Sequence, residues 1–295
     1  MQTSGAFTDD ERRRIEQACE LLAPCRLCPR TCHVNRLGGQ VGFCGLGGRM
    51  TISSYGPHFG EESVLVGVGG SGTVFLTGCN LGCLFCQNYE ISIHREGREV
   101  EVGQVVRIML ELEERGCANI NFVTPTPQAP RVLEAIIRAR KRGLGAPIVY
   151  NCGGYESVEL LRLLDGYIDI YMPDVKFFDR HLAAELLRAE DYPEVVKAAV
   201  LEMHRQVSDL AIEDGLATRG LLVRHLVMPG AVDDSKAIIY FLADQISPNT
   251  YVNVMAQYRP EHQARRFPQI ARRTSRSEWR EVHDHAKARG LRLAE

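Results

Sequence analysis

The chain has 295 residues, of which 45% are hydrophobic and 24% are charged, and its formal net charge is −2. This composition is ordinary for a globular protein, and it excludes a strongly basic nucleic-acid binder and an acidic disordered chain as descriptions of the whole sequence. The length suits one large α/β domain or two smaller ones. We therefore expect a substantial hydrophobic core and no nucleic-acid partner.

The start of the chain is polar, and it carries Asp9 and Asp10 where a secretory leader would need apolar residues. We therefore predict that no leader is present and that the protein is cytoplasmic. The uncharged stretch 63–89 is long enough to span a bilayer, but its many glycines and polar residues such as Asn80 argue against a lipid-exposed helix. We expect a buried strand within this stretch and no membrane contact.

Residues 1–60 show no regular alternation of strand and helix patterns, whereas the chain from about residue 73 does. We predict a Cys-rich N-terminal extension over residues 1–60, packed on a barrel domain formed by residues 61–295. Six apolar runs in the second part are predicted to be strands: Thr73–Thr77, Asn119–Thr124, Pro147–Asn151, Tyr167–Met172, Leu221–Val227 and Thr250–Met255.

Six strands, each followed by a helix, make a parallel sheet with right-handed crossovers. Six units are too few for a complete eight-stranded barrel. The α/β fold is therefore predicted to be a partial, TIM-like (β/α)6 barrel of parallel strands, with a doubly wound sheet as the alternative.

The helices between these strands are predicted from apolar periodicity and from capping residues. Ser157 is expected to cap a helix over 158–164. A long helix is predicted over about 193–212, and Ser235 is predicted to cap a helix over 236–245.

In both candidate folds the active site lies at the C-terminal ends of the strands. A loop that begins at Cys79 follows the first predicted strand. The segments after the next five strands are Thr124-Pro125-Thr126-Pro127, Asn151-Cys152-Gly153-Gly154, Pro173-Asp174-Val175-Lys176, Pro229-Gly230 and Gln257-Tyr258-Arg259.

Three of the ten cysteines lie on this first loop, where Cys79, Cys83 and Cys86 have the spacing C-x3-C-x2-C. Three thiolates cannot close a tetrahedral zinc site, nor can they ligate all four irons of a 4Fe–4S cluster. One metal position is left open, which is typical of a site that binds a substrate or cofactor. The alternative is a closed zinc or iron–sulfur site whose fourth ligand comes from elsewhere, such as Cys152.

The loop resembles the cluster loop of the radical S-adenosylmethionine (radical SAM) enzymes, including Phe85 at the aromatic position before the last cysteine. This resemblance implies that Cys79, Cys83 and Cys86 are catalytic and hold a 4Fe–4S cluster. It also implies that the open iron chelates S-adenosylmethionine, that one electron cleaves this cofactor to a 5′-deoxyadenosyl radical, and that the radical removes a hydrogen atom from a substrate.

Further motifs resemble the activating enzymes for glycyl radical enzymes. They are Cys86-Gln87-Asn88, Asp174-Val175-Lys176 and the segment that begins at Arg224 and ends with Met228-Pro229-Gly230. Together with residues 252–260, they are most similar to the PflX-like branch related to pyruvate formate-lyase-activating enzyme. The resemblance covers residues from about 21 to 265.

The resemblance implies that Asn88, Asn151, Asp174, Lys176 and Arg224 bind the cofactor. The alternatives are an Asx turn for Asn88, a surface position for Lys176 and a buried pair with a carboxylate for Arg224. Asp174 could also act only by orienting Lys176.

The second strand departs from the pattern of many radical SAM enzymes, in which a Gly-Gly-Glu segment binds the amino group of the cofactor. Thr124 and Thr126 occupy this place, and their hydroxyls could accept the same hydrogen bonds.

A second cysteine group lies in the extension, where Cys25, Cys28, Cys32 and Cys44 are interspersed with turn glycines. Four thiolates suit either zinc or a second 4Fe–4S cluster, and the spacing does not decide between them. His33 could replace one cysteine as a ligand, and four unrelated thiols are the remaining alternative. Such a site could deliver electrons to the Cys79 loop or only stabilise the extension.

The leading functional hypothesis is therefore a radical SAM enzyme with S-adenosylmethionine and an electron donor such as flavodoxin or ferredoxin as partners. The alternatives are a non-catalytic iron–sulfur protein for electron transfer or cluster assembly, and a zinc-stabilised binding module. The substrate stays open between a glycyl residue of a partner protein and a small molecule.

Overall fold

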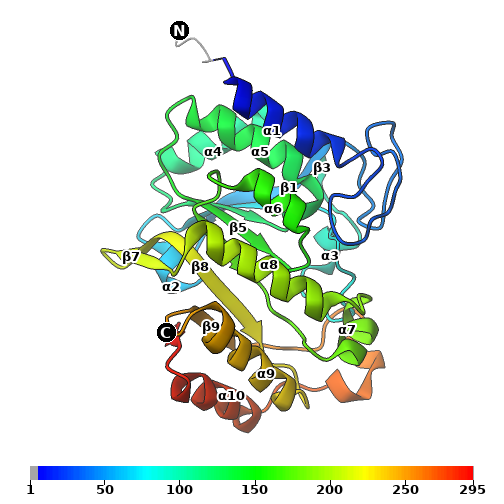
Figure 1. Ribbon diagram of the computed structural model, residues 1–295, viewed down its shortest axis with the longest axis vertical. Helices are drawn as coiled ribbons and strands as arrows, with labels where there is room; N and C mark the ends of the chain where they lie inside the picture. The colour runs from blue at the N-terminus through cyan, green and yellow to red at the C-terminus, as the bar shows by residue number, and fades with distance from the viewer. Residues whose placement is uncertain (1–5, 295) are drawn as a thin grey trace.

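A computed structural model describes residues 6–294, so the first five residues of the predicted extension and the last residue of the predicted barrel lie outside it. The described residues form one ten-stranded sheet in which the order is β10-β9-β8-β6-β5-β4-β2-β1-β3, and β7 pairs with β8 (Figure 1). The six predicted strands are neighbours in this sheet and follow one another in chain order. They are β2 (Ser71–Leu76), β4 (Ile120–Val123), β5 (Ile148–Cys152), β6 (Ile170–Pro173), β8 (Leu216–Leu226) and β9 (Tyr251–Met255).

All neighbouring pairs among these six strands are parallel. The sheet ends at β3 and β10 within the described residues, so the barrel is open and the predicted partial (β/α)6 fold is confirmed. The remaining strands extend its two edges and are β1 (Met50–His58), β3 (Arg98–Val100), β7 (Ala211–Glu213) and β10 (Arg292–Leu293).

Helices cover the outside of the sheet, and their apolar faces supply much of the core. Helix α5 is buried along most of its length and packs against α4, while α8 packs against α6 and α7. The crossover helices are α4 (Val102–Glu114), α5 (Ala129–Arg140), α6 (Val158–Leu164), α7 (Arg180–Leu187), α8 (Tyr192–Val207), α9 (Val232–Phe241) and α10 (Arg276–Ala288). The others are α1 (Asp9–Glu20) and the short helices α2 (Ser63–Val66) and α3 (Tyr89–Ser92).

Two predicted helix boundaries are wrong. Helix α8 ends at Val207 rather than near Ile212, because Ser208 adopts a φ of 63° and the chain then forms β7, antiparallel to β8. Helix α9 begins at Val232, so Ser235 lies inside it and is not its cap. The Ser235 hydroxyl instead donates to the Ala231 carbonyl at 3.0 Å and lies 2.9 Å from Nε2 of the buried His225. In contrast, Ser157 caps α6 as predicted, by accepting a hydrogen bond from the Leu160 N–H.

The N-terminal segment is packed against the barrel. Helix α1 contacts α5 and α6, and Glu11 forms an ion pair with Lys141 at 2.8 Å. Strand β1 joins the sheet by antiparallel pairing with both β2 and β3, which the sequence pattern did not predict. No helix among residues 6–294 is long and apolar enough to cross a membrane.

Candidate functional site

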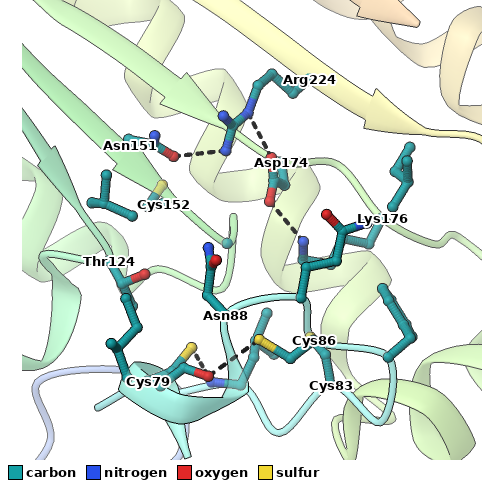
Figure 2. A pocket seen from close by; sticks show the side chains of 18 of the residues that line it. Cys79, Cys83, Cys86, Asn88, Thr124, Asn151, Cys152, Asp174, Lys176 and Arg224 are labelled. Carbon is teal, nitrogen blue, oxygen red and sulfur yellow. Dashed lines mark hydrogen bonds and ion pairs between the residues drawn. The ribbon is translucent and has the colours of Figure 1, made fainter. Parts of the chain in front are cut away.

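A cavity of about 270 Å³ lies at the C-terminal ends of the parallel strands, where the fold predicts an active site (Figure 2). One wall is the loop after β2, which carries the three cysteines. The other walls are the ends of β4, β5, β6, β8 and β9. The polar and thiol side chains around the cavity are those of Cys79, Cys83, Cys86, Gln87, Asn88, Ser92, Thr124, Asn151, Cys152, Asp174, Lys176, Arg224 and Gln257.

The three-Cys loop is held in place by its backbone and by one aromatic anchor. Its Gly82 and Leu84 N–H groups donate to carbonyls at the end of α7, at 3.3 and 2.9 Å. Phe85 is 5% exposed, and its ring packs edge-to-face against Phe177 and Tyr258 with centroids 6.1 Å away from each. Phe85 and the three thiols all line the cavity.

The three cysteines of this loop are half-buried. Burial raises the pKa of Cys79, and it raises the pKa of Cys83 to about 12. Cys79 Sγ accepts a hydrogen bond from the Leu81 N–H at 3.3 Å, and Cys86 Sγ lies 3.1 Å from Ser92 Oγ. The Cys79 and Cys83 thiols are therefore protonated at neutral pH, and a metal that binds them must displace these protons.

The donor set fits a cluster bound by three thiolates. Cys79, Cys83 and Cys86 line a single cavity that extends beyond them to the strand ends, which leaves space on the side opposite the thiols. Among residues 6–294, no three His, Cys, Asp or Glu side chains form a site for a single metal ion. An iron–sulfur cluster binds its thiolates through different iron atoms, so its ligands do not have to converge on one point.

A network of charged side chains faces the thiols across the cavity (Figure 2). Asp174 accepts hydrogen bonds from Arg224 Nε at 2.9 Å and from Lys176 Nζ at 2.7 Å. Arg224 Nη2 donates to Asn151 Oδ1 at 2.7 Å, and Arg224 Nη1 lies 3.7 Å from Glu61 Oε2. Strand register explains this arrangement, because Asp174 forms a parallel bridge with Arg224 directly beyond the end of β6.

This network is charged at neutral pH. Burial opposes ionisation of Asp174, but the charges of Arg224 and Lys176 outweigh it and lower the pKa of the carboxyl group. Burial likewise opposes the charge on Lys176, yet Asp174 holds the pKa of Lys176 above its ordinary value. The structure therefore places two cations and Asp174 at the cavity wall, with Glu61 close behind Arg224.

Asn88 and Thr124 occupy the remaining sides of the cavity. Asn88 lies at the N-cap position of α3 without making a side-chain capping bond, and its amide points into the cavity (Figure 2). Thr124 adopts a φ of 58°, uncommon for a β-branched residue, and its N–H donates to the Asn151 carbonyl at 2.8 Å. Such conformations cluster at functional sites.

The profile described as "Radical SAM superfamily" matches residues 73–243, which is more than half of the chain. The chain belongs to the radical SAM superfamily.

Two uncharacterized proteins of Methanocaldococcus jannaschii are similar to this radical SAM chain. The first is 31% identical over 295 residues, covering 95% of this chain and 79% of its own length. The second is 24% identical, covering 83% of this chain and 73% of its own length. A crystal structure of Streptococcus suis SuiB is similar with a TM-score of 0.49 and 13% identity, covering 74% of this chain and 47% of SuiB.

Radical SAM membership means that the protein is an enzyme that uses a 4Fe–4S cluster and S-adenosylmethionine. The three cysteines of the loop and the five residues that the resemblance assigns to cofactor binding all line the cavity. Two of the segments predicted to follow strands at the site, 124–127 and 229–230, contribute only Thr124 to the lining of the cavity. Gly230 does not line the cavity, because the chain turns away and its N–H donates to Glu278. Thr126 is fully buried and donates instead to Glu156 at 2.7 Å.

Sequence reasoning missed two carboxylates behind this radical SAM cavity. Glu61 reaches Arg224 from the segment between β1 and α2, and nothing in its local sequence marks this long-range contact. Glu156 follows the Gly153-Gly154 turn after β5, so its place near a strand end was the available signal. Burial raises the pKa of Glu156 to about 7, although hydrogen bonds from Thr126 and Tyr150 partly compensate.

Glu156 gives a testable pH dependence of stability. The pKa of Glu156 in the folded protein lies above its ordinary value of 4.5. The contribution of Glu156 to the free energy of unfolding is therefore fully present below pH 4.5 and is lost as pH rises through about 7. We expect Glu156→Gln to stabilise the protein by about 3 kcal/mol at pH 8 and by much less at pH 5, as measured by denaturant unfolding. The exposed Glu114→Gln is the matched control. An equal effect of Glu156→Gln at both pH values would contradict this prediction.

The cysteines of the extension converge on a separate small cavity. Cys25, Cys28, Cys32 and Cys44 all line it, together with Asn80 of the three-Cys loop. The Phe43 N–H donates to Cys32 Sγ at 3.3 Å, and burial raises the pKa of Cys28 to about 12. His33 is exposed and is not among the described residues around this cavity.

The extension and the three-Cys loop are in direct contact. Arg30 Nε donates to the Asn80 carbonyl at 2.8 Å, and its guanidinium lies 3.9 Å from the centre of the Phe43 ring. A Cβ atom added to Gly78 would lie 2.9 Å from the Cys44 carbonyl oxygen. Only glycine therefore fits where the two cysteine-bearing segments meet.

Proposed function

We propose that Cys79, Cys83 and Cys86 hold the radical SAM cluster of this enzyme, and that the enzyme removes a hydrogen atom from a glycyl residue of a partner protein. The observation that carries the first part is the set of three thiols on one side of a single cavity, with Asn88, Asp174, Lys176 and Arg224 on its other sides. The motifs that resemble the PflX-like branch support the second part. An open barrel edge is compatible with the entry of a peptide loop.

When bound, the cluster and S-adenosylmethionine supply a 5′-deoxyadenosyl radical that can abstract hydrogen. The residues of the chain bind and orient the cofactor. We propose that Lys176 donates to the cofactor carboxylate and Asn88 to the ribose, because ammonium and amide groups suit these oxygen acceptors. Asp174 holds Lys176 at the cavity wall, while Arg224 fixes Asp174 and Asn151. The apolar side chains of Leu226 and Met255 limit access of water to the same cavity.

The test is anaerobic reconstitution with iron and sulfide, followed by S-adenosylmethionine and a strong reductant. Formation of 5′-deoxyadenosine and methionine would support the cluster assignment, and a protein that binds iron without forming either would instead be a non-catalytic iron–sulfur carrier. For the substrate, a glycine-containing peptide deuterated at Cα should transfer deuterium into 5′-deoxyadenosine. Deuterium transfer only from small molecules would reject the glycyl proposal.

Asn88→Ala and Lys176→Ala are expected to weaken S-adenosylmethionine binding while leaving iron content and absorption unchanged. Loss of one charge-assisted hydrogen bond costs roughly 1.5–3 kcal/mol, so Lys176→Ala should lower affinity about 10- to 150-fold. The neutral amide of Asn88 should contribute less, roughly 0.5–1.5 kcal/mol. Anaerobic titration measures both affinities, and Lys236→Ala is the control because Lys236 pairs with Glu281 on the surface. Wild-type affinity in both variants would remove these residues from the binding site.

We further propose that residues 1–60 form a unit with its own metal centre at Cys25, Cys28, Cys32 and Cys44, holding zinc or a second 4Fe–4S cluster. All four thiols line one small cavity, which supports this proposal. No three of them are placed to hold a single metal ion, which favours a cluster, whose thiolates bind different iron atoms, over zinc. The boundary near residue 60 falls between β1 and β2, although β1 itself belongs to the central sheet. Measurement of the iron and zinc content of the purified protein distinguishes a zinc ion from a second 4Fe–4S cluster at this site.

A further inference from the structure

A second face of the three-Cys loop borders another cavity, of about 290 Å³. Cys79, Leu81 and Ser92 line both this cavity and the radical SAM cavity, but Asn151, Asp174, Lys176 and Arg224 do not line it. The other described residues around it are Phe43, Cys44, Gly82, Ile93, Arg95, Arg188, His262 and Gln263. We call this the outer cavity. It lies where the extension, α3 and the end of α7 come together, at the right of Figure 1.

In the outer cavity, the side chains of two arginines lie close to glycines of the extension and of the three-Cys loop. A Cβ atom on Gly45, directly after Cys44, would lie 1.6 Å from Arg95 Nη1. A Cβ atom on Gly82, between Cys79 and Cys83, would lie 3.2 Å from Arg188 Cδ. Both arginines are exposed, and neither forms an ion pair with a residue in the range 6–294. Each guanidinium is therefore available to an external anionic group.

Among the described residues, the lining of the outer cavity includes Arg95 and Arg188 and no Asp or Glu. Burial and then the charges of His94, Arg188 and Arg266 lower the pKa of His262, which also lines this cavity. Acidic side chains lie nearby, since Glu90, Glu261 and Glu96 raise the pKa of Tyr89, whose ring stacks on His262, but Glu261 is already paired with Arg259 at 3.1 Å.

Exposed apolar side chains lie near Arg95. Phe43 is 43% exposed and lines the outer cavity, and Leu37 and Val41, which are 51% and 57% exposed, line a neighbouring cavity that Arg95 also lines. Cationic side chains next to a small apolar patch are typical of a surface that binds an acidic protein transiently.

We propose that the outer cavity is the docking site of an acidic one-electron carrier protein. This proposal rests on the proposed cluster at Cys79, Cys83 and Cys86. The strand-end side of the loop is taken up by the cofactor and substrate, so the donor approaches from the other side, where Cys44 and Cys79 share one cavity. One electron leaves the reduced carrier and reduces the oxidised cluster, and no bond forms or breaks between the two proteins. Arg95 and Arg188 attract and orient the carrier by charge complementarity.

The test compares two reductants of the anaerobically reconstituted protein. Reduced flavodoxin is the acidic carrier, and photoreduced 5-deazariboflavin is a small uncharged control that needs no docking site. Stopped-flow absorption follows cluster reduction in the wild type, in Arg95→Glu and Arg188→Glu, and in the charge-neutral Arg95→Gln. Arg107→Glu on the exposed side of α4 is the matched control.

We expect each charge reversal to lower the second-order rate constant with flavodoxin about 10-fold at low ionic strength, and the wild-type rate to fall as salt is added. Arg95→Gln should have an intermediate effect, and Arg107→Glu none. Rates with 5-deazariboflavin should be the same in all variants.

Unchanged flavodoxin rates in the variants, or a salt-independent wild-type rate, would overturn the docking proposal. Equal slowing with both reductants would also overturn it, because the arginines would then act on the cluster itself. Failure of 5-deazariboflavin to reduce the wild-type cluster would refute the proposed function, and the docking proposal with it.

Discussion

Simultaneous replacement of Cys79, Cys83 and Cys86 by alanine is expected to abolish formation of 5′-deoxyadenosine. The three thiols are the only cysteines of the loop that lines the radical SAM cavity, and no other residue of this loop can supply a thiolate. Anaerobic incubation with S-adenosylmethionine and dithionite, followed by chromatographic analysis of the products, measures the effect. Formation of 5′-deoxyadenosine in the normal amount by the triple variant would show that the cluster is held elsewhere.

The same variant tests whether the two cysteine groups are independent. The extension thiols line a cavity of their own, so the folded triple variant should keep the metal bound by Cys25, Cys28, Cys32 and Cys44. Replacement of those four residues should remove this metal and leave the iron that is bound by the three-Cys loop in place. Cys19→Ala on α1 is the control for loss of a thiol outside both groups. Loss of all metal from a folded triple variant would contradict two independent sites.

Asp174→Ala is expected to have the largest effect on stability of any single substitution in the cavity. Asp174 pairs with both Lys176 and Arg224, and among the described residues its removal leaves Lys176 unpaired and Arg224 with only the more distant Glu61, at 3.7 Å, as an ion-pair partner. Breaking a buried pair by removing one partner costs about 3–5 kcal/mol. The side chain of Asp174 is 21% exposed, so we expect about 3 kcal/mol, at the low end of this range. Denaturant unfolding of the metal-free protein measures the change.

Two further variants separate charge from packing at this position. Asp174→Asn keeps the shape and one acceptor, so it should destabilise less than Asp174→Ala. Asp165→Ala removes a carboxylate that pairs with Arg205 on the surface, and such exposed pairs contribute less than about 1 kcal/mol. An unfolding free energy for Asp174→Ala equal to that of the wild type would show that the network does not stabilise the fold.

The six parallel strands and the position of the three-Cys loop could be predicted from local patterns, whereas the strand order came from the structure. Buried parallel strands are continuous apolar runs, and four of the six predicted runs, such as Asn119–Thr124, begin and end within two residues of the observed strands. Strand β6 begins three residues later than predicted and β8 begins five residues earlier. The Cys79 loop and the Asp174 segment each follow such a run. Because all parallel strands of the barrel end at one edge, their residues were expected to meet, and they do.

Features that depend on long-range contact could not be predicted in this way. Strand β1 and the short strand β3 pair with each other across an intervening stretch of about 40 residues, and their sequences carry little apolar periodicity. Ser235 has the character of a helix cap, but its burial against His225 places it inside α9. In both cases tertiary packing outweighs a weak local preference.

The amino-acid sequence by itself determined the chemistry available to this protein: three thiols on one loop, and amide, carboxylate and cationic groups at the strand ends. Only the tertiary structure decided how these groups are paired. Register places Asp174 beside Arg224, the turn after β5 buries Glu156, and the extension brings Cys44 against Gly78. The physical reason is that spacing along the chain governs neighbours within one loop or helix, whereas contacts between distant segments depend on how the whole core packs.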